Sequence, residues 1–334
     1  MRTRLARLVA PLTALLSLAF PTVAAAHGPV PDEAPDPARL LLTWTVEPLV
    51  VIGLVVAAVV WLRTVGRVDR AHPGNPVPPR RTAAFLAGLA AIALALLSGI
   101  GRYDTALFSI HMIQHVLLVL VAAPLIVLSA PVTLALRASS PATRRGLLLP
   151  ILHSLPVRVL AHPVVAWIVF AAVMWAAHFS PLFDAALEDP LIHDAEHALF
   201  LAAGLLFWWP ALGADPAPWR MPPVVRAMYV FLQMPQNTFL AVAITFATTP
   251  LYRHYATLAA AWLPDPLADQ HVAGAIMWLA GDAIFLVALF GLVLAWMRAD
   301  ERGQAREDRR ADAARAEIRE REARLAESLG RDRG

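Results

Sequence analysis

The stretch HMIQHVLLVLVAAPLIVLSAPV, residues 111–132, joins two histidines to a long apolar run. No charged residue follows His115 until Arg137, and a helix needs about 20 apolar residues to cross a bilayer. Spacing of four places His111 and His115 on one face of such a helix. The stretch therefore predicts a membrane span with two potential ligands near its beginning.

Composition extends this prediction to the whole chain. Of its 334 residues 58% are hydrophobic, and the mean hydropathy is +0.59, which is typical of a polytopic membrane protein. We expect an all-α bundle of seven transmembrane helices, near residues 40–62, 82–100, 107–128, 163–179, 192–212, 224–247 and 272–297. The chain has no cysteine, which excludes disulfides and thiolate ligands.

Arginine placement predicts the direction of the bundle. Arginines gather in alternate connections and at the start of the tail: Arg63, Arg67, Arg70, Arg80, Arg81, Arg137, Arg144, Arg145, Arg158, Arg220, Arg226 and Arg298. The positive-inside rule assigns these connections to the cytoplasm. We therefore expect an extracytoplasmic N-terminus and a cytoplasmic C-terminus. This pattern of basicity bears on topology and gives no reason to expect nucleic acid as a partner.

The ends of the chain differ from the bundle in composition. Arginines at positions 2, 4 and 7 precede an apolar run, 8–20, and the small residues before His27 resemble a cleavage site. We predict a signal peptide at 1–26, an extracytoplasmic segment at 27–39, the bundle at 40–298 and a charged cytoplasmic tail at 299–334. Cleavage after Ala26 would make His27 an N-terminal copper chelator.

A second histidine pair repeats the spacing of the first. His193 and His197 lie in HDAEH at the start of the fifth predicted span, and His178 ends the fourth. The positive end of a helix disfavours imidazolium, and neutral imidazole is the form that binds metals. We predict a metal site formed by His111, His115, His178, His193 and His197. The alternative is that these rings only hydrogen-bond between helices.

Nitrogen-rich sites without cysteine suit copper, zinc or haem iron. Thioether ligands would favour Cu(I), and Met112, Met174 and Met277 lie close to the histidines or at the start of the last span. Methionine in an apolar helix also serves as ordinary packing. Further polar residues fall inside predicted spans: Gln233, Asn237 and Asp282, which could line a path or satisfy the backbone.

Three segments resemble one known family. They are residues 111–132, HFSPLFDAALEDPLIHDAEHALFLAAGLLFWWPAL at 178–212 and DQHVAGAIMWLAGD at 269–282, and they are similar to the CtaG family of seven-span assembly factors associated with caa-type cytochrome c oxidases. The five histidines fall at the family's histidine positions, as do Trp208, Trp209 and Pro210 and the pair Asp269 and Gln270. His271 follows that pair, and we treat His271, Met112 and Asp269 as further candidate ligands.

The resemblance implies a multi-pass plasma-membrane protein that matures a haem–copper oxidase by supplying copper, with the oxidase subunits and membrane lipid as partners. No P-loop, GxSxG or zincin pattern occurs, so we expect a binding and delivery protein with no catalytic residues. Two alternatives stay open: a membrane redox protein that binds haem, and a transporter of copper or protons.

Overall fold

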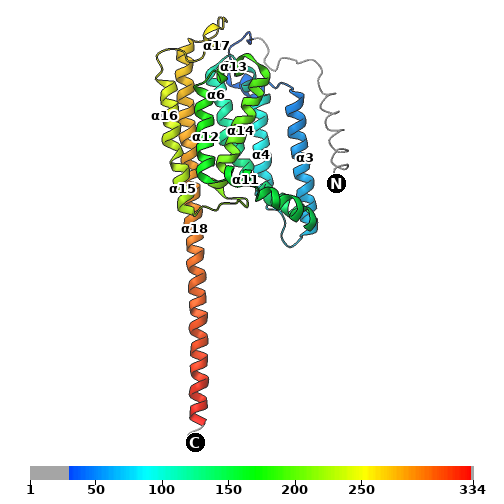
Figure 1. The fold of residues 1–334 in the computed structure, drawn as a ribbon, viewed down its shortest axis with the longest axis vertical. Coiled ribbons are helices and arrows are strands. Elements are labelled where there is room, and N and C mark those ends of the chain that lie inside the picture. Colours follow the sequence, from blue (N-terminus) through cyan, green and yellow to red (C-terminus); the bar gives the residue numbers. More distant parts are fainter. Residues whose placement is uncertain (1–29, 332–334) are drawn as a thin grey trace.

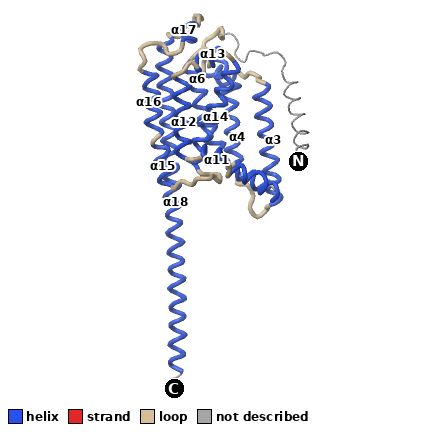
Figure 2. Tube along the Cα trace, in the orientation of Figure 1, coloured by secondary structure: helices blue, strands red, loops and turns tan. Residues whose placement is uncertain are grey.

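The computed structural model describes residues 30–331, and all regular structure in that range is helical (Figures 1 and 2). The predicted signal peptide, 1–26, and His27 lie outside the described residues. The helices, with two π-helical segments labelled η, run in this order: α2 (Pro37–Leu42), α3 (Pro48–Ala71), α4 (Pro79–Leu97), α5 (Gly99–Tyr103), α6 (Phe108–Val116), η1 (Leu117–Ala122), α7 (Ala123–Ser129), α8 (Pro131–Ala138), α9 (Pro141–Thr143), η2 (Arg144–Leu148), α10 (Leu149–Leu152), α11 (Leu155–Leu160), α12 (Pro163–His178), α13 (Leu182–Glu188), α14 (Pro190–Leu212), α15 (Pro223–Phe231), α16 (Gln233–Thr245), α17 (Arg253–Thr257) and α18 (Pro266–Arg331).

Five helical stretches among the described residues are long and apolar enough to cross a membrane. They are α3, α4 with α5, α6 through α8, α14, and α18 as far as Glu322. A sixth forms if α12 and α13, which meet at a bend of 64°, cross together. The helical, membrane-type bundle predicted from the sequence is confirmed, and the described residues contain five or six candidate spans.

The sixth predicted segment, 224–247, is interrupted. It forms α15 and α16, of 9 and 13 residues, which meet at Leu232 and lie one above the other in Figure 1. Neither helix alone reaches the length of a span. The apolar sequence is interrupted at this point by three polar residues, Gln233, Gln236 and Asn237. Seven spans therefore stay a prediction.

The first span begins later than the sequence predicted. Leu40 belongs to the short helix α2, and α3 starts only at Pro48. Proline disfavours helical backbone in the residue before it and fits the first helical turn itself. Glu47 accordingly has extended backbone, with φ −94° and ψ 102°. The helix then continues past the predicted end at 62 to Ala71.

A π-helical segment, η1, follows the first histidine pair directly. Pro124 lies two residues beyond its end, at the second position of α7. Proline lacks an N–H and its ring clashes with the carbonyl four residues earlier, so a wider turn before it relieves the clash. π-Segments of this kind are frequent at functional sites.

The surface and the core of the bundle are both apolar. Large side chains on α3 face outward, including Leu49, Ile52 and Val55, as expected where lipid replaces water. The main core joins α6, α12, α14, α16 and α18. Gly274 on α18 allows close packing, because a Cβ there would meet the Thr245 backbone nitrogen at 2.8 Å.

The two ends of the bundle differ in character. The α3–α4 and α14–α15 connections lie at the end from which the remainder of α18 extends as a long helix (Figure 1). These connections and the tail carry many of the arginines. The beginning of α6 and the α12–α13 bend lie at the opposite end. That second end holds the two histidine pairs and His178.

Candidate metal centre

Two helix beginnings bring the histidine pairs into place. Asp189 caps α14 by accepting hydrogen bonds from the Leu191 and Ile192 backbone nitrogens, at 2.8 and 3.3 Å. Asp269, from α18, accepts a hydrogen bond of 3.2 Å from the Ser109 nitrogen at the start of α6. Side-chain acceptors at these positions satisfy N–H groups that the helix leaves unpaired. Each pair therefore lies in the first turns of a fixed helix.

The four paired rings face one another in the interior. Ring centroids of His111 and His115 on α6 are 4.2 Å apart, as are those of His193 and His197 on α14. Between the helices, His111 lies 5.2 Å from His193, and His115 lies 6.2 Å from His197. All four residues are buried. The structure thus joins two pairs far apart in sequence into one cluster.

His178 completes the cluster from the end of α12. Its ring centroid lies 6.2 Å from that of His115. Its Nδ1 is 2.7 Å from the Met174 carbonyl oxygen, a contact that makes Nδ1 the donor and leaves Nε2 as a potential ligand. Nε2 is buried and has no hydrogen-bond partner among the described residues.

A carboxylate that the sequence reasoning missed lies at the centre. Glu196 Oε2 is 3.6 Å from His111 Nε2 and 3.9 Å from His115 Nε2. The signal was present in the spacing, because Glu196 follows His193 by three residues and so shares its helix face. Gln114 follows His111 by the same interval. Both motifs therefore have the form H-x-x-Q/E-H.

Several polar atoms of the cluster lack hydrogen bonds. Within the described part of the chain this holds for both ring nitrogens of His111 and of His115 and both carboxylate oxygens of Glu196. A buried polar group without a partner costs about 1–3 kcal/mol, and such a group in a native protein calls for an explanation such as a bound ion. A bound ion would provide these atoms with partners.

A hydrogen-bonded chain supports the cluster from one side. Gln114 Oε1 lies 2.8 Å from His197 Nε2, while its Nε2 donates to Asp104 Oδ2 at 2.8 Å and to the Ala95 carbonyl at 3.1 Å. Asp104 Oδ2 in turn lies 3.9 Å from His193 Nε2. Burial raises the pKa of Asp104, in the connection before α6, to about 8. Gln114 and Asp104 were also missed from the sequence.

The donor geometry fits a first-row metal ion. Two sets of side chains each offer three ligand atoms within 4.8 Å of one another: Asp104, His193 and His197 in one set, His111, His193 and Glu196 in the other. Imidazole nitrogen with carboxylate oxygen is a donor set for copper, zinc or iron. His193 belongs to both sets, so the two possible ion positions are adjacent. The cluster could hold an ion at either of them.

Aromatic side chains enclose the site. The His115 ring stacks on Phe200 with centroids 4.1 Å apart, and Phe183 lies 4.8 Å from His111. Both phenylalanines are fully buried. An apolar shell of this kind limits solvent access and lowers the local dielectric constant.

A small cavity of about 30 Å³ adjoins His115. Three methionines from three helices line it, Met112 from α6, Met174 from α12 and Met277 from α18, and the amides Gln233 and Asn237 contribute from α16. Met112, a weaker candidate from the sequence, therefore lies beside the cluster.

The other weaker candidates lie elsewhere. His271 is exposed, with Nε2 3.2 Å from the Ala247 carbonyl, and Asp269 caps α6 as described. Asp282 accepts hydrogen bonds from Asn237 and Thr238, at 3.0 and 2.8 Å, and so joins α16 to α18. Neither His271 nor Asp269 belongs to a group of possible metal ligands among the described residues.

Fold and site together define a class of protein: an apolar helical bundle with a buried histidine–carboxylate cluster at one end. The sequence profile of the cytochrome c oxidase caa3 assembly factor family (Caa3_CtaG) matches residues 59–299. The chain belongs to this family, and the resemblance seen in the sequence is confirmed.

Curated relatives extend the match. The chain is 34% identical over 292 residues to an uncharacterized protein of Mycobacterium leprae, which covers 85% of this chain and 44% of the relative. It is 35% identical over 291 residues to uncharacterized proteins of Mycobacterium bovis and Mycobacterium tuberculosis, covering 84% of this chain and 44% of each relative. The chain thus spans under half the length of these relatives. No solved structure matches it.

Proposed function

We propose that this protein is a plasma-membrane assembly factor that binds copper at the histidine cluster and delivers it to a caa3-type cytochrome c oxidase. The observation that carries the proposal is the burial of His111 and His115 against Glu196, where their ring nitrogens and carboxylate oxygens have no hydrogen-bond partner among the described residues. Copper is here a cargo. The chain's own residues bind it, exclude water and release it, with no bond of a substrate made or broken.

Copper is favoured over other metals by the neighbouring methionines. Neutral imidazole binds both copper oxidation states, and thioether sulfur selects Cu(I). The cavity lined by Met112, Met174 and Met277 directly adjoins His115. An ion could therefore move between a nitrogen-rich and a sulfur-rich environment without leaving the bundle.

Charge distribution supports an extracytoplasmic position for the cluster. The arginine-rich connections lie at the other end of the bundle, and the positive-inside rule assigns that end to the cytoplasm. Exposed carboxylates surround the histidine end, among them Glu188, Asp189 and Asp194. Such a surface raises the local concentration of cations. With seven spans the N-terminus would be outside and the charged tail in the cytoplasm.

The haem alternative requires room for a macrocycle between axial ligands. The clustered rings instead contact one another and Phe183 and Phe200, and the cavity beside His115 measures only about 30 Å³. The transporter alternative requires a polar path, whereas Asp282 is engaged by Asn237 and Thr238. Copper delivery is the function that these contacts favour.

The test is metal analysis of the purified protein with oxidase activity measured in the same membranes. We expect His111→Ala/His115→Ala to lose bound copper and oxidase activity together. His271→Ala, an exposed histidine outside the cluster, is the matched control and keeps both. Full oxidase activity in the double variant would show that oxidase assembly does not require the cluster. A strong Soret band in the absorbance spectrum of the purified protein would show that it binds haem, and would contradict the copper proposal.

A further inference from the structure

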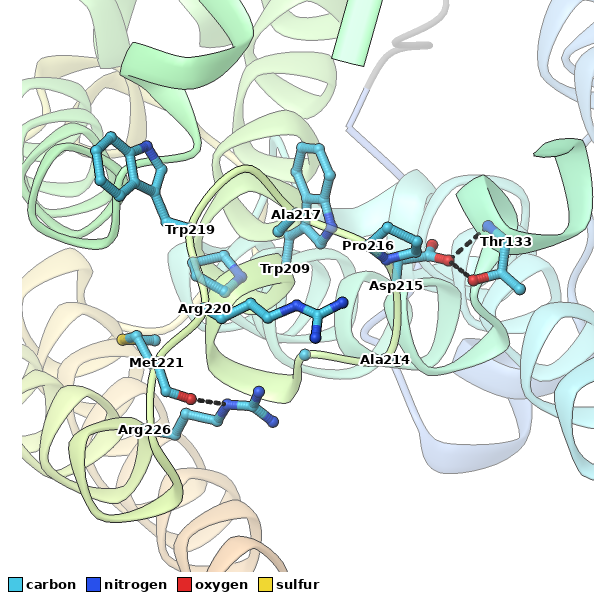
Figure 3. Close-up of a pocket in the computed structure, with 12 residues that line it drawn as sticks. Thr133, Trp209, Ala214, Asp215, Pro216, Ala217, Trp219, Arg220, Met221 and Arg226 are labelled. Atoms are coloured by element: carbon cyan, nitrogen blue, oxygen red, sulfur yellow. Dashed lines mark hydrogen bonds between the residues drawn. The ribbon is translucent and has the colours of Figure 1, made fainter. Parts of the chain in front are cut away.

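A second polar site lies at the arginine-rich end of the bundle. The α14–α15 connection and the start of α8 enclose a cavity of about 360 Å³ (Figure 3). Its lining includes Trp209, Arg220 and Arg226, together with Thr133 and Asp215. The cavity is large enough for several water molecules or for a phosphate group with its surroundings, since one water takes about 30 Å³.

Two guanidinium groups share this cavity. Both Arg220 and Arg226 line it, and in Figure 3 their side chains extend in the same direction. Arg226 donates from Nε to the Met221 carbonyl at 3.0 Å and from Nη1 to the Leu212 carbonyl at 3.4 Å. Neither arginine forms an ion pair with a carboxylate in the described range 30–322. Two like charges held together favour an anion between them.

The acidic residue of the cavity is committed elsewhere. Asp215 accepts hydrogen bonds from the Val132 nitrogen at 2.9 Å and from the Thr133 nitrogen and hydroxyl, both at 2.6 Å. In Figure 3 its carboxylate points toward Thr133 and away from both arginines. It therefore anchors the start of α8, and the guanidinium groups have no carboxylate counterion among the described residues.

A tryptophan supplies an unused donor. Trp208 and Trp209 are neighbours in the WWP step, and Trp208 Nε1 donates to the Val119 carbonyl at 3.0 Å. Trp209 Nε1 is buried beside the cavity and has no hydrogen-bond partner among the described residues. An indole nitrogen can only donate, so the group that would satisfy it is an acceptor. This observation points to a ligand independently of the arginines.

We propose that this cavity binds a phosphate group, with Arg220 and Arg226 neutralising its charge and Trp209 donating to one of its oxygens. Guanidinium and phosphate match in geometry and form strong charge-assisted hydrogen bonds. The phosphate can belong to the headgroup of an anionic phospholipid or to a free phosphate ion. The cavity lies at the end of the apolar bundle, where headgroups would meet the protein, and Trp219 at its rim is 40% exposed.

Native mass spectrometry of the purified full-length protein tests this proposal. Phosphatidylglycerol is the anionic probe, phosphatidylcholine the zwitterionic comparison, and inorganic phosphate the competitor. We expect Arg220→Gln to weaken phosphatidylglycerol binding about tenfold, which corresponds to about 1.4 kcal/mol. Trp209→Phe keeps the aromatic ring and weakens binding through loss of the indole donor. Arg145→Gln, which removes an exposed arginine outside the cavity, is the matched control.

Each outcome decides the proposal. Weaker binding in Arg220→Gln and Trp209→Phe, with Arg145→Gln unchanged, supports it. Competition by inorganic phosphate would identify the free ion as a ligand, and binding that phosphate leaves intact would identify the lipid. Three results would overturn the site. They are undiminished phosphatidylglycerol binding in Arg220→Gln, an equal loss of binding in Arg145→Gln, and no binding of either lipid or phosphate. Unchanged thermal unfolding verifies that each variant is folded.

Discussion

Glu196 Oε2 lies 3.6 Å from His111 Nε2, and neither atom has a hydrogen-bond partner among the described residues. Glu196 comes from α14 and His111 from α6, so two helices far apart in sequence bring a carboxylate and an imidazole together in the interior. An isolated buried charge is costly unless it is paired or coordinates a metal. A cation bound between the two groups would satisfy both of them.

Glu196→Gln separates metal binding from folding. The substitution keeps the shape and removes the negative charge, so we expect copper affinity to fall by about tenfold or more, as for other residues that support a metal site. The apo protein should unfold at an equal or higher temperature, because a buried carboxylate is replaced by a neutral amide. Competition titration with a copper chelator and thermal unfolding check the two effects.

The control for Glu196→Gln is Glu188→Gln, which neutralises an exposed carboxylate at the end of α13. It should leave copper affinity unchanged within about twofold, since exposed charges interact weakly. If both variants lost affinity equally, the effect would come from the general negative charge of this end, and the central role of Glu196 would be wrong.

Gln114→Leu removes the residue that links Asp104, His197 and the Ala95 carbonyl. Buried acceptors would lose their donor, at about 1–3 kcal/mol for each unsatisfied group. We expect the free energy of unfolding to fall by about 2 kcal/mol and copper affinity to fall as His197 loses its orientation. Denaturant unfolding in detergent measures the first effect. The exposed Gln304→Leu provides the comparison, and equal stabilities of the two variants would refute a supporting role for Gln114.

Two glycines on α18 give opposite expectations for the same substitution. At Gly274 a Cβ would clash with Thr245 Oγ1 and would meet backbone atoms of α16 at 2.8 and 3.1 Å, whereas at Gly291 it would meet nothing within 4 Å. Overpacking typically costs about 1–3 kcal/mol, so Gly274→Ala should destabilise the bundle. Gly291→Ala should be neutral or stabilising by up to about 1 kcal/mol, the helix preference for alanine. Thermal unfolding of both variants tests this, and similar shifts would contradict the observed α16–α18 packing.

The sequence predicted those parts of the site that depend on one helix alone. Spacing of four placed His111 with His115 and His193 with His197, because helical periodicity is a local property. The same rule, applied at three residues, would have found Glu196 and Gln114. Asp104 could not be found in this way, since it precedes α6 in a connection and reaches the cluster only through tertiary packing.

Two further features could not be predicted from the sequence: the contacts of His271 and the exact boundaries of the helices. His271 carries the right chemistry at the start of the last span, yet its ring contacts the Ala247 carbonyl, because the orientation of α18 depends on its packing against α16. Apolar length predicted where most helices run. It could not separate the start of α3 at Pro48 from the short helix before it, nor reveal the break at Leu232. Those boundaries follow from proline stereochemistry and from local polarity.

X-ray absorption spectroscopy of the copper-loaded full-length protein tests the central claim most directly, because it reports the atoms bonded to the ion. We predict an imidazole scattering pattern from at least two histidine ligands, which His111→Ala/His115→Ala removes and His271→Ala leaves unchanged. A spectrum without imidazole scattering, or one identical in the double variant, would contradict copper binding by the cluster at His111, His193 and Glu196.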